Sequence, residues 1–294
     1  MATLSQWVEG SRPRTLPAAV APVLVGTGAA YAIGKGSSAF TLLALLVSLA
    51  LQVGVNYAND YSDGIRGTDQ DRVGPVRLVG QGLAKAENVK LAAMLSFTGA
   101  ALFGLTLVAL SGTFVLLLVG AAAIAAAWYY TGGERPYGYS GLGEVFVFVF
   151  FGLVATLGTM YTQALTVSLA SVAGAVGVGA IASAILVANN LRDIPTDLAQ
   201  GKQTLAVRLG DARTRILYAA LLTVALACVI AIGVIHPTAF IALLSFVLAF
   251  PLVRRVSGGA LGRDLIPVLS GTGRFELLYS ALLSLGLATV PHLG

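Results

Sequence analysis

The sequence predicts an all-α, polytopic membrane protein whose nine transmembrane helices form a bundle. Of the 294 residues, 57% are hydrophobic and 11% are charged, and the mean hydropathy is +0.86. A soluble chain typically carries about 25% charged residues. The apolar residues also recur in runs of roughly 17–22, the length that a helix needs to cross a hydrocarbon core about 30 Å thick. A membrane β-barrel would instead show alternating segments of about ten residues, which this sequence lacks.

Clusters of glycine, proline and charged residues divide the apolar sequence into nine segments. The predicted spans are residues 15–33, 40–58, 89–110, 113–131, 143–161, 168–190, 212–234, 238–256 and 275–292. Short, nearly uncharged connections alternate with long polar ones, which include the loops 59–88 and 191–211. Since no polar segment exceeds about 30 residues and a soluble domain typically needs at least 50, residues 1–294 are predicted to form a single transmembrane domain.

The charges predict how the chain lies in the membrane. The N-terminal segment, the long connections and the adjacent span ends hold 17 of the 18 lysines and arginines, and only Lys35 lies opposite. Because loops rich in these residues stay cytoplasmic, the N-terminus and the long loops are predicted to face the cytoplasm of a cell (inner or plasma) membrane, with the C-terminus outside. Topology thus explains the net charge of +5, and nucleic acid is not predicted as a partner. All 13 aspartates and glutamates lie on the same side as the basic residues. Membrane orientation does not require this, so their position indicates a chemical site on that side.

The stretch of residues 56–72, NYANDYSDGIRGTDQDR, follows the second span directly. It carries Asp60, Asp63, Asp69 and Asp71 beside Asn56 and Asn59. On a helix, the i, i+4 spacing places Asn59 and Asp63 on one face, with Asn56 one turn earlier. Carboxylates this close repel each other unless a positive group lies between them, and clustered oxygen ligands suit Mg²⁺. The alternative is a solvated acidic loop that ends a helix.

A second polar cluster closes the sixth predicted span. It contains Asn189, Asn190, Arg192, Asp193 and Asp197. Asp193 and Asp197 also have i, i+4 spacing, although Pro195 between them is expected to kink the helix or restart it. Alone, this cluster is equally compatible with a helix-ending loop that makes ordinary salt bridges.

Together, the two clusters predict a diphosphate site. Each follows an even-numbered span, and each is trailed by basic residues: Arg66, Arg72 and Arg77 after the first, Lys202 and Arg208 after the second. Mg²⁺ commonly binds one or two carboxylates plus phosphate oxygens, and lysine and arginine pair with the remaining oxygens. The sequence contains no GxxxxGK[ST] phosphate loop that would indicate a nucleotide.

The connection after the fourth span is rich in glycine, proline and tyrosine, and two interpretations remain open. One is a rigid loop with aromatic residues at the membrane interface. The other is a pocket over the acidic site, in which Arg135 holds a carboxylate and Tyr130, Tyr137 and Tyr139 flank a cation or an aromatic ring.

The chain resembles the UbiA superfamily of intramembrane prenyltransferases over nearly its whole length. Within that superfamily it is most similar to the branch that acts on 1,4-dihydroxy-2-naphthoate. The resemblance rests on RPRTLPAAVAPVLVG, NYANDYSDGIRGTDQDRVGP, GGERPYGYSGLGEVFVFVFFG and NNLRDIPTDLAQGKQTLAVRLG. The first and last acidic motifs are typical of the superfamily, whereas the third segment and the DRVGP tail resemble the naphthoate branch.

The resemblance implies nine helices around a polar cavity that opens to the cytoplasm and laterally to lipid, with two motifs for Mg²⁺. Asn59 and Asp63 match the first motif, NxxxDxxxD, and Asp193 and Asp197 match the second, DxxxD. Gly67 stands where the first motif has its third acid, so Asp69 is the expected substitute. The implied cofactor is two Mg²⁺ ions, replaceable by Mn²⁺. The implied catalytic residues are Asn59, Asp60, Asp63, Asp193 and Asp197, with Asp60 as a further ligand or a support for the ligands.

The implied reaction transfers a polyprenyl group from polyprenyl diphosphate to 1,4-dihydroxy-2-naphthoate with loss of CO₂, while the isoprenoid tail stays in membrane lipid. Asn56, Asn189 and Asn190 join the three tyrosines and Arg135 as candidates for the acceptor pocket. One alternative is a prenyltransferase for another acceptor, such as 4-hydroxybenzoate. An ion-coupled transporter is an alternative from a different class, but its acids would more typically lie at mid-membrane depth in related halves of the chain.

Overall fold

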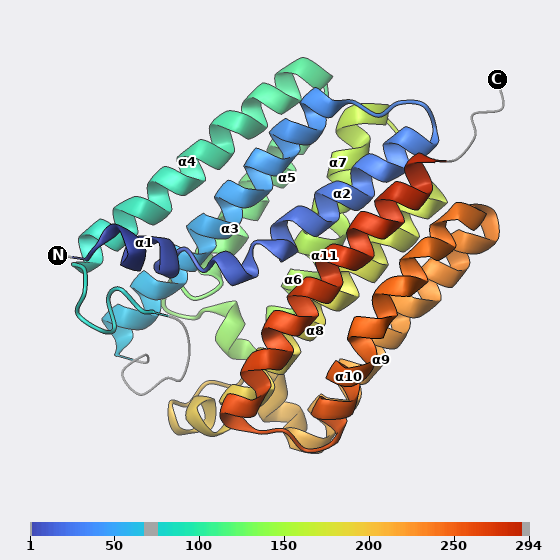
Figure 1. Cartoon of the computed structure of the whole chain (residues 1–294). Helices are drawn as coiled ribbons and strands as arrows, with labels where there is room; N and C mark the ends of the chain where they lie inside the picture. Colours follow the sequence, from blue (N-terminus) through green and yellow to red (C-terminus); the bar gives the residue numbers. More distant parts are fainter. Residues whose placement is uncertain (1, 68–75, 290–294) are drawn as a thin grey trace.

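A computed structural model describes residues 2–67 and 76–289, and all regular structure within those ranges is helical (Figure 1). The long rods are α2 (Pro17–Ala32), α3 (Ser38–Arg66), α4 (Ala86–Ser111), α5 (Leu116–Tyr129), α8 (Leu169–Ala199), α9 (Leu205–Ile235) and α11 (Ile266–Ala288). Two more rods are composite: α6 (Gly143–Val147) continues through η3 (Phe148–Val154) into α7 (Ala155–Ala164), and η4 (Pro237–Ser245) continues into α10 (Phe246–Ser257). The short elements are α1 (Leu4–Gly10), η1 (Pro13–Thr15), η2 (Tyr137–Ser140) and η5 (Gly262–Leu265).

The helices have the length and composition of membrane spans. Six helices of the described chain are long and apolar enough to cross a membrane, or up to seven if the bent pair Leu4–Thr15 and Pro17–Ala32 forms one span. α5, with 14 residues, is a shorter apolar helix. The protein is therefore an all-helical membrane protein with six or seven apolar spans, and each of the nine predicted segments coincides with one rod.

Two helices extend beyond their predicted ends and thereby carry both acidic motifs. The spans predicted at 40–58 and 168–190 belong to helices that end at Arg66 and Ala199. Hydropathy ends a span at the first polar cluster, but the acidic side chains in these extensions are buried against neighbouring segments, so the helices continue. Pro195 lies inside α8 and does not restart it. The motifs were predicted at the start of the loops 59–88 and 191–211. In the structure they lie on the last turns of α3 and α8.

The last helix also begins earlier than predicted, at Ile266 and not near residue 275. Glu276, predicted at the edge of a span, consequently lies within the helix and is fully buried. α9, in contrast, contains a break at Gly210, where φ is 75°, a left-handed conformation that glycine adopts without steric cost. The continuous part of α9 therefore begins close to the predicted residue 212.

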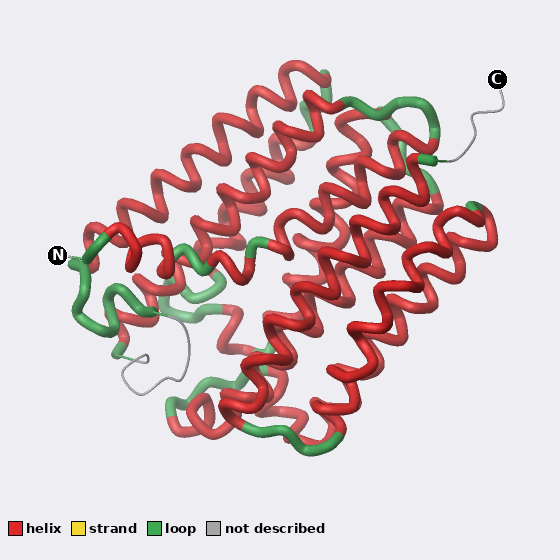
Figure 2. The backbone as a smooth tube through the Cα atoms, in the orientation of Figure 1, coloured by secondary structure: helices red, strands yellow, loops and turns green. Residues whose placement is uncertain are grey.

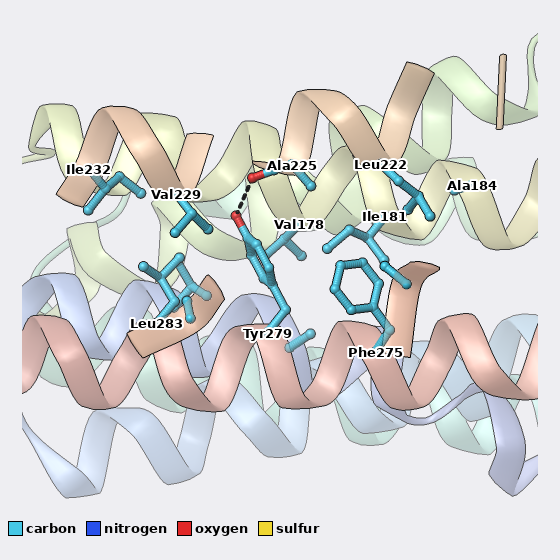
Figure 3. Close-up of a cluster of buried hydrophobic side chains, with 14 of the residues drawn as sticks. Val178, Ile181, Ala184, Leu222, Ala225, Val229, Ile232, Phe275, Tyr279 and Leu283 are labelled. Atoms are coloured by element: carbon cyan, nitrogen blue, oxygen red, sulfur yellow. Dashed lines mark hydrogen bonds between the residues drawn. The ribbon is translucent and has the colours of Figure 1, made fainter. Parts of the chain in front are cut away.

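The larger hydrophobic core lies between α8, α9 and α11 (Figure 3). Phe275, Tyr279 and Leu283 recur every four residues on α11 and point toward α8 and α9, and the Tyr279 hydroxyl donates to the Ala225 carbonyl at 3.3 Å. Small residues bring other helices close: a Cβ atom on Gly152 would lie 2.5 Å from the Cα atom of Gly179. Such close approach is typical of packing between membrane helices.

The N-terminal segment closes one end of the bundle. The Tyr57 hydroxyl on α3 donates to the Trp7 carbonyl on α1 at 2.8 Å, and the two rings meet edge to face at 5.7 Å. Helix α1 and the C-terminal end of α11 lie at opposite ends of the bundle, and residues 76–85 before α4 lie at the same end as α1 (Figures 1 and 2). That end also holds the functional-site candidates.

Candidate functional site

Asp63 lies at the centre of a buried charged cluster near the C-terminal end of α3. The Tyr139 hydroxyl donates to Asp63 Oδ1, and Lys202 Nζ lies 3.9 Å from the same oxygen. Arg77 Nη1 lies 4.0 Å from Oδ2. Both cationic side chains are buried, which places two positive charges beside one carboxylate in a poorly solvated site.

Lys202 connects the two acidic clusters. Its ammonium lies 4.4 Å from the centre of the Tyr139 ring, in a cation–π contact. Its backbone N–H donates to the Asp197 carbonyl at 2.9 Å, and the Thr204 hydroxyl donates to Asp197 Oδ2 at 3.4 Å. The structure therefore brings the ends of α3 and α8 close together, with Lys202 between them.

Asp193 is held by its neighbour in sequence. Arg192 Nε and Nη2 donate to the two Asp193 oxygens at 2.6 and 2.7 Å, and Arg192 Nη2 also donates to Asn189 Oδ1 at 2.9 Å. Asn189 Nδ2 is 3.5 Å from Asp193 Oδ2. Within residues 2–67 and 76–289, no three acidic, histidine or cysteine side chains group closely enough to hold a metal ion by themselves.

Asn59 and Arg66 fasten α3 to the turn after α5. The Thr131 hydroxyl donates to Asn59 Oδ1 at 2.8 Å. The Arg66 guanidinium donates to the carbonyls of Thr131 and Gly133, and it lies 5.6 Å from the centre of the Tyr139 ring. Arg66 therefore donates its hydrogen bonds to the backbone, and these contacts hold the segment that carries Tyr139 next to Asp63.

Asp60, a predicted catalytic residue, organises the segment that carries Arg77. Its Oδ2 and Oδ1 atoms accept from the backbone N–H groups of Leu78 and Val79 at 2.7 and 3.1 Å. Its side chain is fully buried, and Arg12 lies within electrostatic range. Asp60 thus folds the segment after the first motif back onto α3. The sequence reasoning did not include Arg12, although it lies in the RPRTLP segment that the family resemblance includes.

An apolar cavity of about 510 Å³ begins beside this cluster and runs between α3, α4, α5 and the α6–α7 rod. Asn56, Asn59, Tyr130 and Tyr137 line its polar end. The rings of Tyr130 and Tyr137 meet edge to face at 5.5 Å, and the Tyr137 hydroxyl donates to the Ala126 carbonyl at 2.8 Å. Burial raises the pKa of Tyr137, so this hydroxyl stays protonated. The site therefore joins charged groups for a polar head to an apolar channel.

The three tyrosines predicted for the pocket lie in two different places. Tyr130 and Tyr137 lie on the cavity, whereas Tyr139 lies beneath Lys202 at the charged cluster. Arg135, predicted to hold the acceptor carboxylate, is exposed. Arg208 is exposed too, with its Nε donating to the Gln203 carbonyl at 3.1 Å. Of the other predicted residues, Asp69 and Arg72 lie outside the described residues.

Two asparagines predicted for the acceptor pocket donate hydrogen bonds to groups that were not predicted as site residues. Asn56 Nδ2 donates to the Ser11 carbonyl at 2.8 Å and to the Thr15 hydroxyl at 2.9 Å. Asn190 Nδ2 donates to Oε1 of the buried Glu144 at 2.9 Å. A signal for Glu144 was available, because it is the single acid at the start of an apolar segment, GEVFVFVFFG.

Comparisons with known proteins give matches over most of the chain. The model of the UbiA prenyltransferase family matches residues 19–259. A 1,4-dihydroxy-2-naphthoate octaprenyltransferase of Mycobacterium tuberculosis is 55% identical over 288 residues, which cover 98% of each chain. A protein of the same name from Haemophilus influenzae is 40% identical over 296 residues, covering 97% of this chain and 96% of the relative.

The fold has a counterpart among solved structures. A UbiA homolog from Archaeoglobus fulgidus, solved with DMAPP and Mg²⁺, superimposes with a TM-score of 0.67 at 16% sequence identity. The likeness covers 97% of this chain and 100% of the archaeal chain, and it extends over the whole arrangement of helices.

Proposed function

The chain belongs to the UbiA prenyltransferase family, and from this premise we propose that it transfers a polyprenyl group from polyprenyl diphosphate to 1,4-dihydroxy-2-naphthoate. One observation carries the proposal: the apolar cavity opens beside a carboxylate flanked by two buried cations. A long isoprenoid diphosphate has this division into an apolar tail and an anionic head. The acceptor is proposed from the full-length similarity to relatives named for 1,4-dihydroxy-2-naphthoate.

The proposed reaction begins when the C–O bond of the prenyl diphosphate breaks and its electron pair leaves with the diphosphate. Lys202 and Arg77 stabilise the departing charge, because both are buried beside Asp63. The rings of Tyr130 and Tyr137 face the allylic cation that remains. The naphthoate ring then forms the new C–C bond with the allylic cation. The bond between the ring and the carboxylate breaks, CO₂ leaves, and the electron pair of that bond stays in the ring and restores its aromaticity. The products are demethylmenaquinol, CO₂ and diphosphate.

We propose two Mg²⁺ ions, replaceable by Mn²⁺, as the cofactor, and oxygen donors at this end of the bundle would hold them together with the diphosphate. Asn59 and Asp63 from α3, with Asp193 and Asp197 from α8, are hard oxygen ligands, and Mg²⁺ often needs only one or two carboxylates when phosphate oxygens complete its shell. When bound, Mg²⁺ supplies positive charge that stabilises the leaving group. Arg192 must release Asp193 for that residue to act as a ligand, and a diphosphate is a suitable new acceptor for the guanidinium.

We further propose that the single transmembrane domain crosses the cell membrane nine times, with the N-terminus and the site facing the cytoplasm. The nine rods of the described chain, the opposite positions of α1 and the C-terminal end of α11, and the one-sided basic residues support this arrangement. It would let a water-soluble naphthoate reach the site from the cytoplasm while the isoprenoid tail enters the apolar cavity from the bilayer.

The test is an assay of detergent-purified protein with carboxyl-labelled 1,4-dihydroxy-2-naphthoate, a polyprenyl diphosphate and Mg²⁺. We expect prenylated product, labelled CO₂ and diphosphate in equal amounts, and loss of all three after chelation of the metal. Asp63→Asn is expected to abolish turnover, whereas the matched control Asp211→Asn removes an acid that pairs with Arg215 outside the cavity and should remain active. Turnover of 4-hydroxybenzoate in place of the naphthoate would refute the acceptor assignment.

A further inference from the structure

Three glycines line the apolar cavity at positions where a side chain would meet almost nothing. A Cβ atom built on Gly120 or Gly158 would have no described atom within 4 Å. On Gly104 its nearest neighbour would be Val47 Cγ2, at 3.9 Å. Packing glycines differ: a Cβ atom on Gly54 would lie 2.6 Å from the Phe97 ring. At the three cavity positions, the missing side chains therefore leave open volume and do not serve close helix contact.

The three glycines come from three different rods and lie at similar depth. Gly104 on α4 faces Val47, which is about 18 Å along α3 from Asn59 at a rise of about 1.5 Å per residue. Gly120 is about 15 Å along α5 from Tyr130 by the same measure. Gly158 is on α7, well beyond the ring of Phe146 at the start of the rod. The cavity is thus widened at its far half, away from the charged cluster.

We propose that Gly104, Gly120 and Gly158 are specificity-determining residues that set how many isoprene units of the donor the cavity accommodates. The inference rests on the proposed function, in which the diphosphate lies at Asp63 and the tail extends into the cavity. A short tail ends before the glycine level, whereas a long tail passes between the three rods. Side chains added there would exclude the distal units and leave the reacting end of the donor unaffected.

The test compares geranyl diphosphate with octaprenyl diphosphate as donors for Gly104→Leu and Gly120→Leu. We expect kcat/KM for the octaprenyl donor to fall by about 10-fold or more, since a few methylene groups in an apolar pocket change selectivity by that amount. The value for the geranyl donor should stay within about twofold of the unmodified protein. Product lengths from a mixture of donors, measured by mass spectrometry, should shift toward shorter chains.

Gly99→Leu is the matched control. Gly99 is on the same helix as Gly104, and a Cβ atom there would also have no described atom within 4 Å, but Gly99 does not line the cavity. Gly104→Ala and Gly158→Ala extend the test should a leucine variant fail to purify, with a smaller shift in the same direction. Equal loss with both donors, unchanged selectivity, or the same shift in Gly99→Leu would overturn the proposal. Failure of the unmodified protein to prenylate the naphthoate with either donor would instead refute the proposed function.

Discussion

Replacing Asp60 with asparagine is expected to destabilise the protein and to weaken binding of the prenyl diphosphate. Asp60 accepts from two backbone N–H groups, those of Leu78 and Val79, at 2.7 and 3.1 Å. Both bonds hold the segment that positions Arg77 next to Asp63. An asparagine keeps one acceptor oxygen but turns an NH₂ group toward the other backbone donor. The backbone of this segment therefore has to move, and Arg77 moves with it.

The magnitude follows from the buried geometry. A hydrogen bond to a charged group contributes about 1.5–3 kcal/mol, and a buried donor left without an acceptor costs about 1–3 kcal/mol. Losing one such bond while orphaning one N–H group is expected to reduce the free energy of unfolding by about 2–4 kcal/mol. For a chain of this size, that corresponds to a fall in Tm of about 5 °C or more.

The assay combines thermal unfolding in detergent with steady-state kinetics at varied prenyl diphosphate and Mg²⁺. We expect a lower Tm and a kcat/KM for the donor lowered about tenfold, because in the proposed function Arg77 stabilises the diphosphate and does not act on the acceptor ring. Asp264→Asn, at an exposed position in η5, serves as the control and should change neither quantity. An unchanged Tm together with abolished kcat would show that Asp60 acts as a metal ligand and that its two backbone bonds are incidental.

Substitutions of three other buried or partly buried side chains should change activity or thermal stability. Tyr139→Phe removes the hydroxyl bonded to the buried Asp63 but keeps the ring beneath the lysine, so kcat/KM should fall about tenfold and the free energy of unfolding by about 1.5–3 kcal/mol; an unchanged Tm would contradict this. Glu144→Ala leaves the buried Asn190 amide without its acceptor and should lower stability by about 1–3 kcal/mol, whereas Glu144→Gln should recover most of it in the same melting experiment. Glu276 is fully buried, and neither carboxyl oxygen has a hydrogen-bond partner among the described residues, so Glu276→Gln should raise the Tm; a decrease would reveal a partner for the carboxyl group.

The apolar helices and the helical spacing within the first acidic motif were predictable from the sequence because both depend on local spacing. Each of the nine apolar segments corresponds to a rod, and the four-residue spacing of Asn59 and Asp63 is realised on a continuous helix. The ends of α3 and α8 were predicted too short. Hydropathy treats a buried polar side chain as exposed, and burial of Asp63 depends on segments far away in sequence, such as the one that carries Tyr139.

The roles of individual site residues were less predictable, because they depend on how loops fold back. Nothing near Asp60 in the sequence indicates that its oxygens bind the backbone of Leu78 and Val79. Glu144 looked like one more acid at the cytoplasmic end of a span, whereas its contact with Asn190 joins two rods. Arg135 had suitable chemistry for a carboxylate, but its exposed position follows from the course of the turn and not from the residue type.

The π-helical segment Phe148–Val154 lies between two halves of its rod that pack against different helices. Before it, the Glu144 carbonyl accepts from Ser183 on α8, and after it Thr156 and Thr159 lie against Gly26 on α2. A π-helix accommodates one residue more per turn than the surrounding α-helix does. Removing a single residue from this segment would therefore restore a uniform α-helix and leave the two halves in nearly their present relative orientation. The rod would then keep both its seam with α8 and its seam with α2, whereas the same deletion within α7 would rotate the residues beyond it by about 100°.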